Sequence, residues 1–365
     1  MNTLKKIILS FFLLSFFQVA FNRNIESPSL LSDDNSNIAN VQNEDARLVF
    51  YNVENLFDIY DDTIKNDDEF ISGGIRSWDK FKFRKKINNI YKTLISVGEW
   101  DAPEIIGLCE IENYFVLEKL INSTPLRKNN YNIIHYESPD KRGIDVAMLY
   151  DSKKITPLFS SPIRIRFPFN EELKTRDILY VKALIFETDT LHLFINHWPS
   201  RYGGLMETKP KRNFVATVLR QKVDSILSTS SKANIIIMGD FNDDPEDESL
   251  SKYLRLSIKI NDKKKNNLVN LMLKTSKDNS SGSLKYKEKW NNFDQIIVSE
   301  NLLNNSNDLK VDNNRAIIFN DDFLLEKDEK YMGVRPFRTY SGYKYKGGFS
   351  DHLPVYIDLV KIRND

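Results

Sequence analysis

The fold of this chain is indicated most clearly by the stretch Ile235-Ile236-Ile237-Met238-Gly239-Asp240-Phe241-Asn242. Its first four residues are apolar and mostly β-branched, which predicts a short strand buried on both faces. Asp240 and Asn242 follow at the carboxyl end of that strand, where open α/β sheets place their chemistry. Taken alone, such residues are also ordinary turn formers, so this stretch leaves both interpretations open.

Three further apolar runs end in the same way, and a fifth polar segment lies near the C-terminus. The residues concerned are Asn52 after Leu48-Val49, Glu110 after 105–109, Asn196-His197 after 191–195, and Ser350-Asp351-His352. A turn-forming role would explain any one of them. It would not explain the recurrence, which favours one functional site assembled from several strand ends.

These five segments, in this order, resemble the endonuclease/exonuclease/phosphatase superfamily, whose fold is deoxyribonuclease I-like. The matching motifs run from Val49 to Tyr356. The segments 51–58, 196–201 and 347–352 are most similar to a secreted bacterial branch of that superfamily. The resemblance implies an α/β fold, a four-layer α/β/β/α sandwich of two packed mixed β-sheets with outer helices.

Apolar periodicity predicts where helices and strands lie. Helical spacing is found in 78–97, 113–122 and 211–227, and alternating or apolar β patterns in 105–109, 131–136, 144–150, 163–167, 178–186, 190–196, 235–239, 293–298 and 353–359. Strands therefore outnumber helices, as a pair of packed sheets with helices outside requires.

The N-terminus predicts export. Lys5-Lys6 and the apolar stretch 7–20 have the pattern of a secretory signal peptide, residues 1–20. That stretch is shorter than the roughly 20 residues that span a bilayer, so we expect no stable membrane span. Residues 21–46 are rich in Asn, Ser and Asp and predict a flexible leader before a catalytic domain at 47–362. We expect a periplasmic or extracellular protein, and take a monomer as the default.

Charge and cysteine content exclude a generally basic protein and a protein stabilised by intramolecular disulfides. Cleavage after residue 20 would remove two lysines and no acid, which leaves 50 basic against 51 acidic residues. Contact with nucleic acid would therefore depend on a local basic patch. Cys109 is the only cysteine, which excludes an intramolecular disulfide, and its apolar surroundings indicate packing rather than nucleophilic catalysis.

The resemblance implies a metal site with oxygen ligands. It assigns Asn52, Glu110 and Asp351 to the metal, with Glu110 as the principal ligand. Carboxylate and amide oxygens suit Mg²⁺ or Mn²⁺ rather than a metal that prefers thiolates.

The resemblance also implies the catalytic residues. Asp240 would orient or deprotonate the attacking water, Asn242 would bind phosphate, and His197 and His352 would contact phosphate oxygens. An imidazole suits this work because its unperturbed pKa lies near about 6.5. Asp294 is expected to orient His352, and Asp145 is our choice of partner for His197. The other histidines, His135 and His192, are interpreted as structural.

Five arginines lie in or beside the motif loops and could recognise phosphate, since a guanidinium binds it in a bidentate way. We choose Arg201 and Arg338 as the substrate-binding pair over Arg142, Arg176 and Arg335. Trp198 and Tyr202 could stack on a base, although packing explains Trp198 equally well.

The sequence thus predicts a secreted, divalent-metal-dependent phosphodiester hydrolase, an endonuclease or related nuclease with nucleic acid as its substrate. The alternative is a phospholipid head-group phosphodiesterase or phosphomonoesterase of the same fold. A catalytically inactive binding module is disfavoured because all the metal and catalytic motifs are present.

Overall fold

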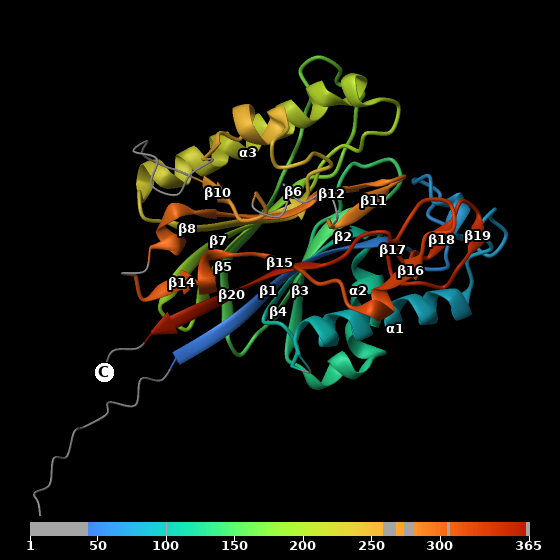
Figure 1. Ribbon diagram of the computed structural model, residues 1–365, viewed down its shortest axis with the longest axis horizontal. Coiled ribbons are helices and arrows are strands. Elements are labelled where there is room, and N and C mark those ends of the chain that lie inside the picture. The colour runs from blue at the N-terminus through green and yellow to red at the C-terminus, as the bar shows by residue number, and fades with distance from the viewer. Residues whose placement is uncertain (1–42, 100, 258–267, 274–280, 305–306, 363–365) are drawn as a thin grey trace, which may run out of the picture. The chain divides into compact units, whose positions relative to one another are not determined.

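The computed structural model describes residues 43–99, 101–257, 268–273, 281–304 and 307–362 (Figure 1). They belong to a compact unit that spans residues 41–365. The expected signal peptide and residues 21–42 of the expected leader lie outside the described residues. Residues 43–46, which we also expected in the leader, instead pair with residues 359–362 and form the beginning of the first strand.

The first large sheet carries two of the motif strands side by side. Strands β1 and β2 run parallel, and the strands on either side of them run antiparallel. The strand order is β14-β20-β1-β2-β4-β3, with β15 paired to β20. Their bounds are β1 Asn43–Leu56, β2 Ile105–Ile111, β3 Tyr131–His135, β4 Asp145–Asp151, β14 Leu309–Val311, β15 Ile317–Ile318 and β20 Val355–Ile362.

The second large sheet carries the other two motif strands, β7 and β8, which are also parallel neighbours. The strand order is β5-β6-β7-β8-β13-β10-β9. The bounds are β5 Ile155–Ile163, β6 Ile178–Ile185, β7 Asp189–His197, β8 Asn234–Asp240, β9 Leu256–Ser257, β10 Leu268–Asn270 and β13 Asp294–Ser299. The strand that we predicted at 163–167 is wrong, because the strand here ends at Ile163 after a run that begins at Ile155.

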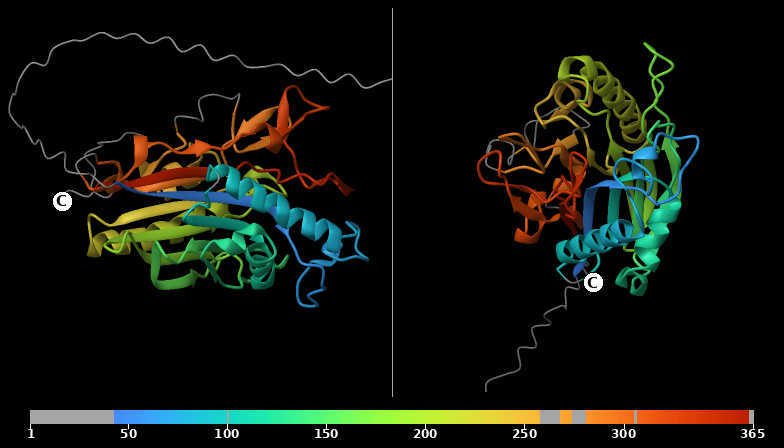
Figure 2. Two further views of the ribbon diagram at one scale, coloured as in Figure 1. Left: turned by 90° about the horizontal axis from the view of Figure 1, so that it is seen from below. Right: turned by 90° about the vertical axis from the view of Figure 1, so that its right-hand side faces the viewer.

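Helices cover the outer faces of both sheets (Figures 1 and 2). Helices α1 (Lys80–Val97) and α2 (Tyr114–Asn122) lie against the first sheet, and α3 (Leu205–Thr229) lies against the second. Helix α3 starts six residues before the expected Lys211 and contains Pro210 in its second turn.

Three separate apolar clusters hold these layers together. Between the sheets, inward-facing residues such as Leu48, Cys109, Ile195 and Met238 form one continuous core. The other two clusters join each sheet to its own helices. Two packed mixed sheets with outer helices confirm the predicted fold class.

Shorter elements decorate the sheet edges. Three hairpins were not predicted: β11 Leu284–Tyr286 with β12 Lys289–Asn291, β16 Leu325–Lys327 with β17 Val334–Pro336, and β18 Tyr340–Ser341 with β19 Lys344–Tyr345. The short helices are η1 Asp68–Phe70, η2 Pro125–Lys128, η3 Ser249–Tyr253, η4 Glu300–Leu303, η5 Asp312–Asn314 and η6 Asp322–Leu324. None of the helices in the described residues is long and apolar enough to cross a membrane.

Candidate active site

The candidate active site lies where the two sheets meet at the carboxyl ends of their parallel strands. In the second sheet, His197 at the end of β7 pairs with Asp240 at the end of β8. Asp240 in turn faces Asp294 at the start of β13. From the first sheet, the Asn52 amide reaches Asp240 Oδ2 at 3.0 Å. Side chains that are distant in sequence are therefore brought together by strand order within each sheet and by the packing of the two sheets.

Glu110 enters the site through an irregularity in β2. Its φ of 62° lies in the left-handed region, and the pairing of β2 with both neighbouring strands shifts beside it. Such a bulge re-aims a side chain. One carboxylate oxygen, Oε2, accepts the Asn55 amide at 2.9 Å, and the other lies 3.4 Å from the Asn52 side-chain amide. The side chains of Asn52 and Glu110 are thus neighbours.

His352 is held from both sides. Its Nδ1 lies 2.6 Å from Asp294 Oδ2, so the structure brings together the pair expected from the sequence. Its main-chain amide donates to Ser350 Oγ, whose hydroxyl donates to the Asn52 carbonyl at 2.7 Å. The free ring nitrogen, Nε2, points to Asp240 Oδ2 at 3.8 Å. The imidazole therefore has a fixed orientation toward the centre of the site.

His197 approaches the carboxylate of Asp240 from β7, the strand next to β8. Its Nε2 lies 3.7 Å from Asp240 Oδ2 and 3.9 Å from Glu110 Oε1. Its Nδ1 makes no hydrogen bond to any residue that the structure describes. His197 is nevertheless almost fully buried, so its position is set by packing and by the strand pairing of β7.

The predicted pairing of Asp145 with His197 is wrong. Asp145 Oδ2 instead lies 3.1 Å from His135 Nε2, and Oδ1 accepts the Ser138 amide at 2.9 Å. The cause is strand register: His135 pairs with Ala147, so Asp145, two residues away on β4, points to the same face. His197 belongs to the other sheet. Asp145 and His135 therefore act together, outside the catalytic centre.

The two site histidines have opposite charge preferences. Burial, followed by Arg176, Arg142 and His352, lowers the pKa of His197 well below its ordinary value. Burial also lowers the pKa of His352, but Asp294 and Asp240 raise it by more, so it lies well above the usual range. Burial raises the pKa of Asp240 to about 7, with Asp294 adding to the rise and His352 opposing it. Asp240 is thus flanked by one histidine whose surroundings favour the neutral form and one whose surroundings favour the protonated form.

Asn242 is anchored beside these groups. Its main-chain N–H donates to Asp240 Oδ1 at 2.9 Å, and its side-chain amide donates to the Trp198 carbonyl at 3.1 Å. Its φ of 50° is one that asparagine tolerates. Trp198 is buried against Phe241, ring centroids 4.8 Å apart, so the packing interpretation of this residue holds. Tyr202, by contrast, is 92% exposed.

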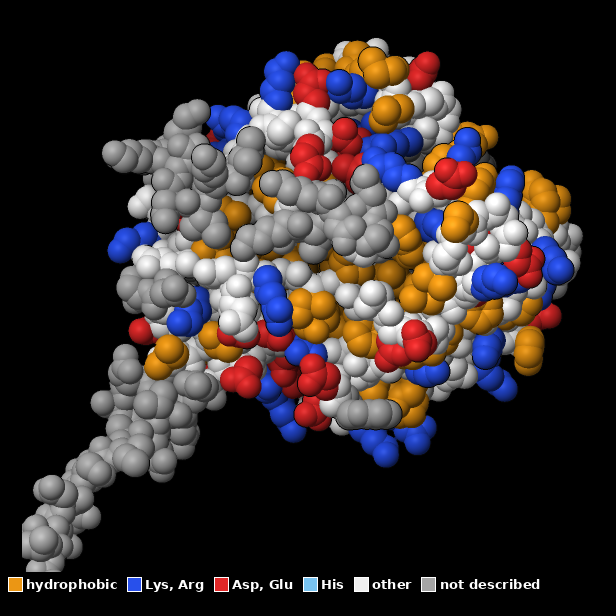
Figure 3. Space-filling view, viewed as in Figure 1, with side chains coloured by type: hydrophobic (Ala, Val, Ile, Leu, Met, Phe, Trp, Pro, Cys, Tyr) orange, Lys and Arg blue, Asp and Glu red, His pale blue; other side chains and the backbone are white. Residues whose placement is uncertain are grey.

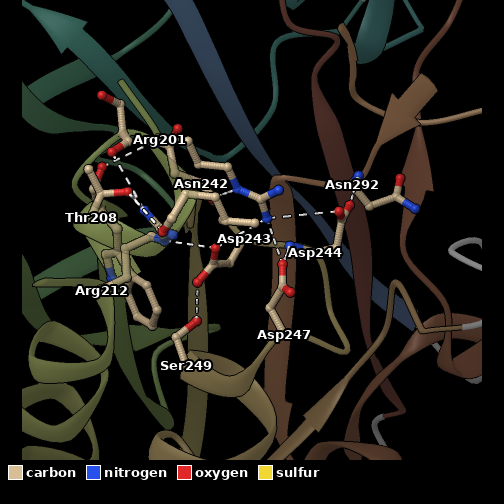
Figure 4. A network of polar contacts seen from close by, with 12 residues as sticks. Arg201, Thr208, Arg212, Asn242, Asp243, Asp244, Asp247, Ser249 and Asn292 are labelled. Atoms are coloured by element: carbon tan, nitrogen blue, oxygen red, sulfur yellow. Dashed lines mark hydrogen bonds and ion pairs between the residues drawn. The ribbon is translucent and has the colours of Figure 1, made fainter. Parts of the chain in front are cut away.

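Arg201, which we expected to bind substrate, is engaged by acidic residues of the loop after β8. It donates to the Asn242 carbonyl at 2.8 Å and to carboxylates of Asp247 at 2.6 Å and Asp243 at 3.1 Å (Figure 4). Asp243 also forms an ion pair at 2.7 Å with Arg212, whose side chain is fully buried. The loop after β8 is therefore clamped by two arginines, and Arg201 positions Asn242 from behind.

Arg338 is also engaged by acids. Its Nη2 lies 2.7 Å from Asp351 Oδ2, and its Nε lies 3.5 Å from Glu54 Oε1. Asp351, expected on the metal, thus shares an arginine with Glu54. Burial, with the nearby charge of Asp351, raises the pKa of Glu54 to about 7.

Beneath this pair lies a buried lysine that the sequence analysis missed. Lys86 donates to the Phe349 carbonyl at 2.7 Å and to the Thr339 hydroxyl. Burial lowers its pKa to about 8. Two signals pointed to this cluster: Lys86 lies within the apolar stripe of α1, and Glu54 lies two residues after Asn52. A lysine in an apolar stripe requires a buried partner.

The donor set fits a hard divalent cation. Ligand atoms of Asp240, Asp294 and His352 all lie within 4.8 Å of one another, and the carboxylate of Glu110 adjoins them through Asn52. These donors are oxygens and one imidazole, and the buried Cys109 presents no thiolate. A second group with the same spacing is formed by His135, Glu137 and Asp145.

Comparison with known proteins agrees with this geometry. A profile described as "Endonuclease/Exonuclease/phosphatase family" matches residues 47–361. No curated protein matches the chain.

Solved structures show the same fold at low sequence identity. The human nocturnin catalytic domain is 16% identical, with TM-score 0.51 over 88% of this chain and 98% of its own. D. rerio TDP2 complexed with single strand DNA product is 13% identical, with TM-score 0.50 over 86% and 98%. Mannosyl-6-phosphatase from Bacteroides thetaiotaomicron is 15% identical, with TM-score 0.51 over 86% and 99%.

Proposed function

The chain belongs to the endonuclease/exonuclease/phosphatase family, and we propose that it is a divalent-metal-dependent phosphodiester hydrolase that cleaves nucleic acid. Members of this family are phosphoesterases that work with divalent metals. One observation carries the proposal. Asp240 Oδ2 lies between the Nε2 atoms of His197 and His352, at 3.7 and 3.8 Å, with Asn52 and Glu110 beside it.

Each residue then has a chemical task. Asp240 orients the attacking water and takes its proton, for which a pKa raised to about 7 by burial is well suited. His352, protonated against Asp294, donates to a non-bridging phosphate oxygen as negative charge develops there. His197 lines the opposite side of the phosphate as a neutral imidazole. Asn242 keeps the loop after β8 in place.

Asn52, Glu110 and Asp351 are the residues that we propose hold Mg²⁺ or Mn²⁺. A bound divalent ion offsets negative charge on the phosphate and favours ionisation of the attacking water. Asp351 would have to exchange part of its contact with Arg338 for the ion. Excess chelator should therefore abolish activity, and Mg²⁺ or Mn²⁺ should restore it.

Nucleic acid is the proposed substrate because structural relatives include TDP2, solved with a single-strand DNA product, and nocturnin. The charge distribution on the surface indicates that contacts with nucleic acid would be local. On the face shown in Figure 3, basic and acidic side chains are interspersed, with no broad basic region. The alternative is a phosphomonoesterase or phospholipid head-group phosphodiesterase. The likeness to a mannosyl-6-phosphatase favours the first of these two.

A substrate panel with purified protein and Mg²⁺ tests the proposal. It contains plasmid DNA, single-stranded DNA, RNA, a phosphatidylcholine vesicle and mannose 6-phosphate. We expect cleavage of nucleic acid, with activity falling as salt rises because each phosphate contact releases counterions. Hydrolysis of mannose 6-phosphate or lipid alone would overturn the nuclease assignment.

A pair of matched variants distinguishes a loss of activity caused by the site from one caused by misfolding. Glu110→Gln keeps the size and hydrogen-bonding reach of the side chain and removes its charge, so turnover should fall by about 10²-fold or more. His192→Asn is the control, since His192 lies on β7 with His197 but bonds Tyr180 at 2.8 Å, away from the site. Equal losses in both variants would contradict the assignment.

We further propose that the chain is exported, on the strength of Lys5-Lys6 and the apolar stretch 7–20. Replacing both lysines by glutamates should slow export. The measurement is the amount of processed protein in the periplasmic and culture fractions, and unprocessed protein confined to the cytoplasm in the wild type would contradict it.

A further inference from the structure

The loop between β3 and β4, residues 136–144, is fastened at its base. Asp145, the first residue of β4, bonds His135 at 3.1 Å and the Ser138 amide at 2.9 Å. Lys65 Nζ donates to the Ser138 carbonyl at 3.1 Å from outside the loop. His135 and Asp145, which the reaction does not use, thus fix the conformation of this loop.

The same loop is tied to the catalytic centre through Asp140. Asp140 Oδ2 pairs with Arg176 Nη1 at 3.0 Å, and Arg176 Nη2 donates to the Trp198 carbonyl at 2.6 Å. That carbonyl directly follows His197 and also accepts the Asn242 side chain. Because β4 is antiparallel to β2, the loop emerges at the edge of the sheet where Glu110 lies.

Arg142 is the arginine of this loop whose guanidinium has no close acidic partner among the described residues and could bind an anion. Its side chain is 49% exposed, and its nearest carboxylate among the described residues is Asp140, at 3.8 Å. The other four arginines of the motif loops have partners within 3.0 Å of the guanidinium: Arg176 on Asp140, Arg201 on Asp247, Arg335 on Glu326 and Arg338 on Asp351. Arg142 alone in that set lacks a close acid.

Strand register places Arg142 at the edge of the sheet that carries the site. Asp145, three residues after Arg142, pairs with Ile111, the residue that follows Glu110. The same loop is joined through Asp140 and Arg176 to the carbonyl of Trp198, the residue that follows His197. A phosphate that enters between Glu110 and His197 would therefore meet this loop. Arg176 cannot take this task because its Nη atoms are committed to Asp140 and Trp198.

We propose that Arg142 is a substrate-binding residue whose guanidinium donates to a non-bridging oxygen of the scissile phosphate beside His197. The inference rests on the proposed function and adds to it the residue that recognises the anion. A guanidinium presents a rigid donor fork that matches phosphate, and it stays charged at every working pH. A loosely paired arginine also has little ion-pair energy to give up when substrate binds.

Kinetics on two substrates test this assignment. Arg142→Ala and Arg142→Lys are compared with Lys141→Ala, an exposed neighbour in the same loop. The substrates are bis(4-nitrophenyl) phosphate, which has no flanking phosphate, and a single-stranded oligonucleotide. We expect Arg142→Ala to lower kcat/KM about tenfold or more on both, the size of a charged hydrogen bond. Arg142→Lys should recover only part, and Lys141→Ala should match wild type.

Binding of inorganic phosphate to the Mg²⁺-loaded protein, measured by calorimetry, provides a readout without turnover. The affinity should weaken about tenfold or more in Arg142→Ala, with an unchanged melting temperature. Unchanged phosphate affinity and kcat/KM would overturn the inference. A loss on the oligonucleotide alone would also overturn it and assign Arg142 to a flanking phosphate. Wild-type protein that binds phosphate through Arg142 but cleaves neither diester would refute the proposed function instead.

Discussion

Asn52 and Asp240 join the two sheets at the centre of the candidate site. They are 188 residues apart, and the Asn52 side-chain amide donates to Asp240 Oδ2 at 3.0 Å. Both residues are buried, so the bond forms in surroundings where an unpaired donor or acceptor is costly. The contact links the strand that carries a proposed metal ligand to the strand that carries the proposed base. Its loss should therefore affect chemistry and stability together.

We predict that Asn52→Ala lowers kcat by about 10²-fold, because Asp240 loses the donor that orients it. The free energy of unfolding should fall by about 1–3 kcal/mol, since a buried acceptor is left unpaired. Steady-state kinetics and denaturant titration measure the two effects. Asn132→Ala, at an exposed position of β3, is the matched control. A fully active Asn52→Ala would contradict the role given to this bond.

Asp294→Asn should lower kcat by about 10²–10⁴-fold with little change in KM, since a catalytic group held in the wrong charge state loses transition-state stabilisation. An amide in place of the carboxylate removes the main charge that raises the pKa of His352, so the imidazole should lose its proton at lower pH. NMR titration of the His352 ring measures that shift directly. Asp322→Asn, at the exposed start of η6, should leave both kcat and the titration unchanged.

Arg212→Met should destabilise the protein by about 3–5 kcal/mol, the size expected when one partner of a buried ion pair is removed. Asp243, at 2.7 Å from Arg212, would be left with less compensation for its buried charge. Adding Asp243→Asn should restore part of the loss, which a double-mutant cycle by thermal unfolding would detect. Strictly additive losses would show that the pair is not coupled.

The stability of the fold should decrease below about pH 6.5 partly through His192. Burial, with Lys182 and Lys222, lowers the pKa of His192 to about 4 in the folded protein. The unfolded chain binds the proton near 6.5, so between pH 6.5 and 4 it binds more protons than the folded one, and stability falls as the pH falls. His192→Asn, whose carbonyl can still accept the Tyr180 hydroxyl, should flatten this part of the melting-temperature profile. An unchanged profile would contradict the assignment.

The sequence by itself determined the strand ends and the family. Strands such as 235–238 and 105–109 can be recognised from the sequence because their apolar pattern involves only residues that are adjacent in the chain. The polar residues that follow them lie at one edge of a sheet because parallel strands end at the same edge. The fold class could be predicted for the same reason. Pattern also indicated that His192 serves packing, because alternation along one strand is a local property.

Apart from the Asp294–His352 pair, which the family resemblance implied, only the tertiary structure decided which partner each of these polar side chains has. Asp145 bonds His135 because of the register of β3 against β4, which no local pattern specifies. Arg201 and Arg338 lie in motif loops as expected, yet each is engaged by acids from distant segments. A hydrogen bond or ion pair depends on distances of a few ångströms between such segments, and packing of the two sheets sets those distances. For the same reason, only the folded chain shows that Arg142 is left available.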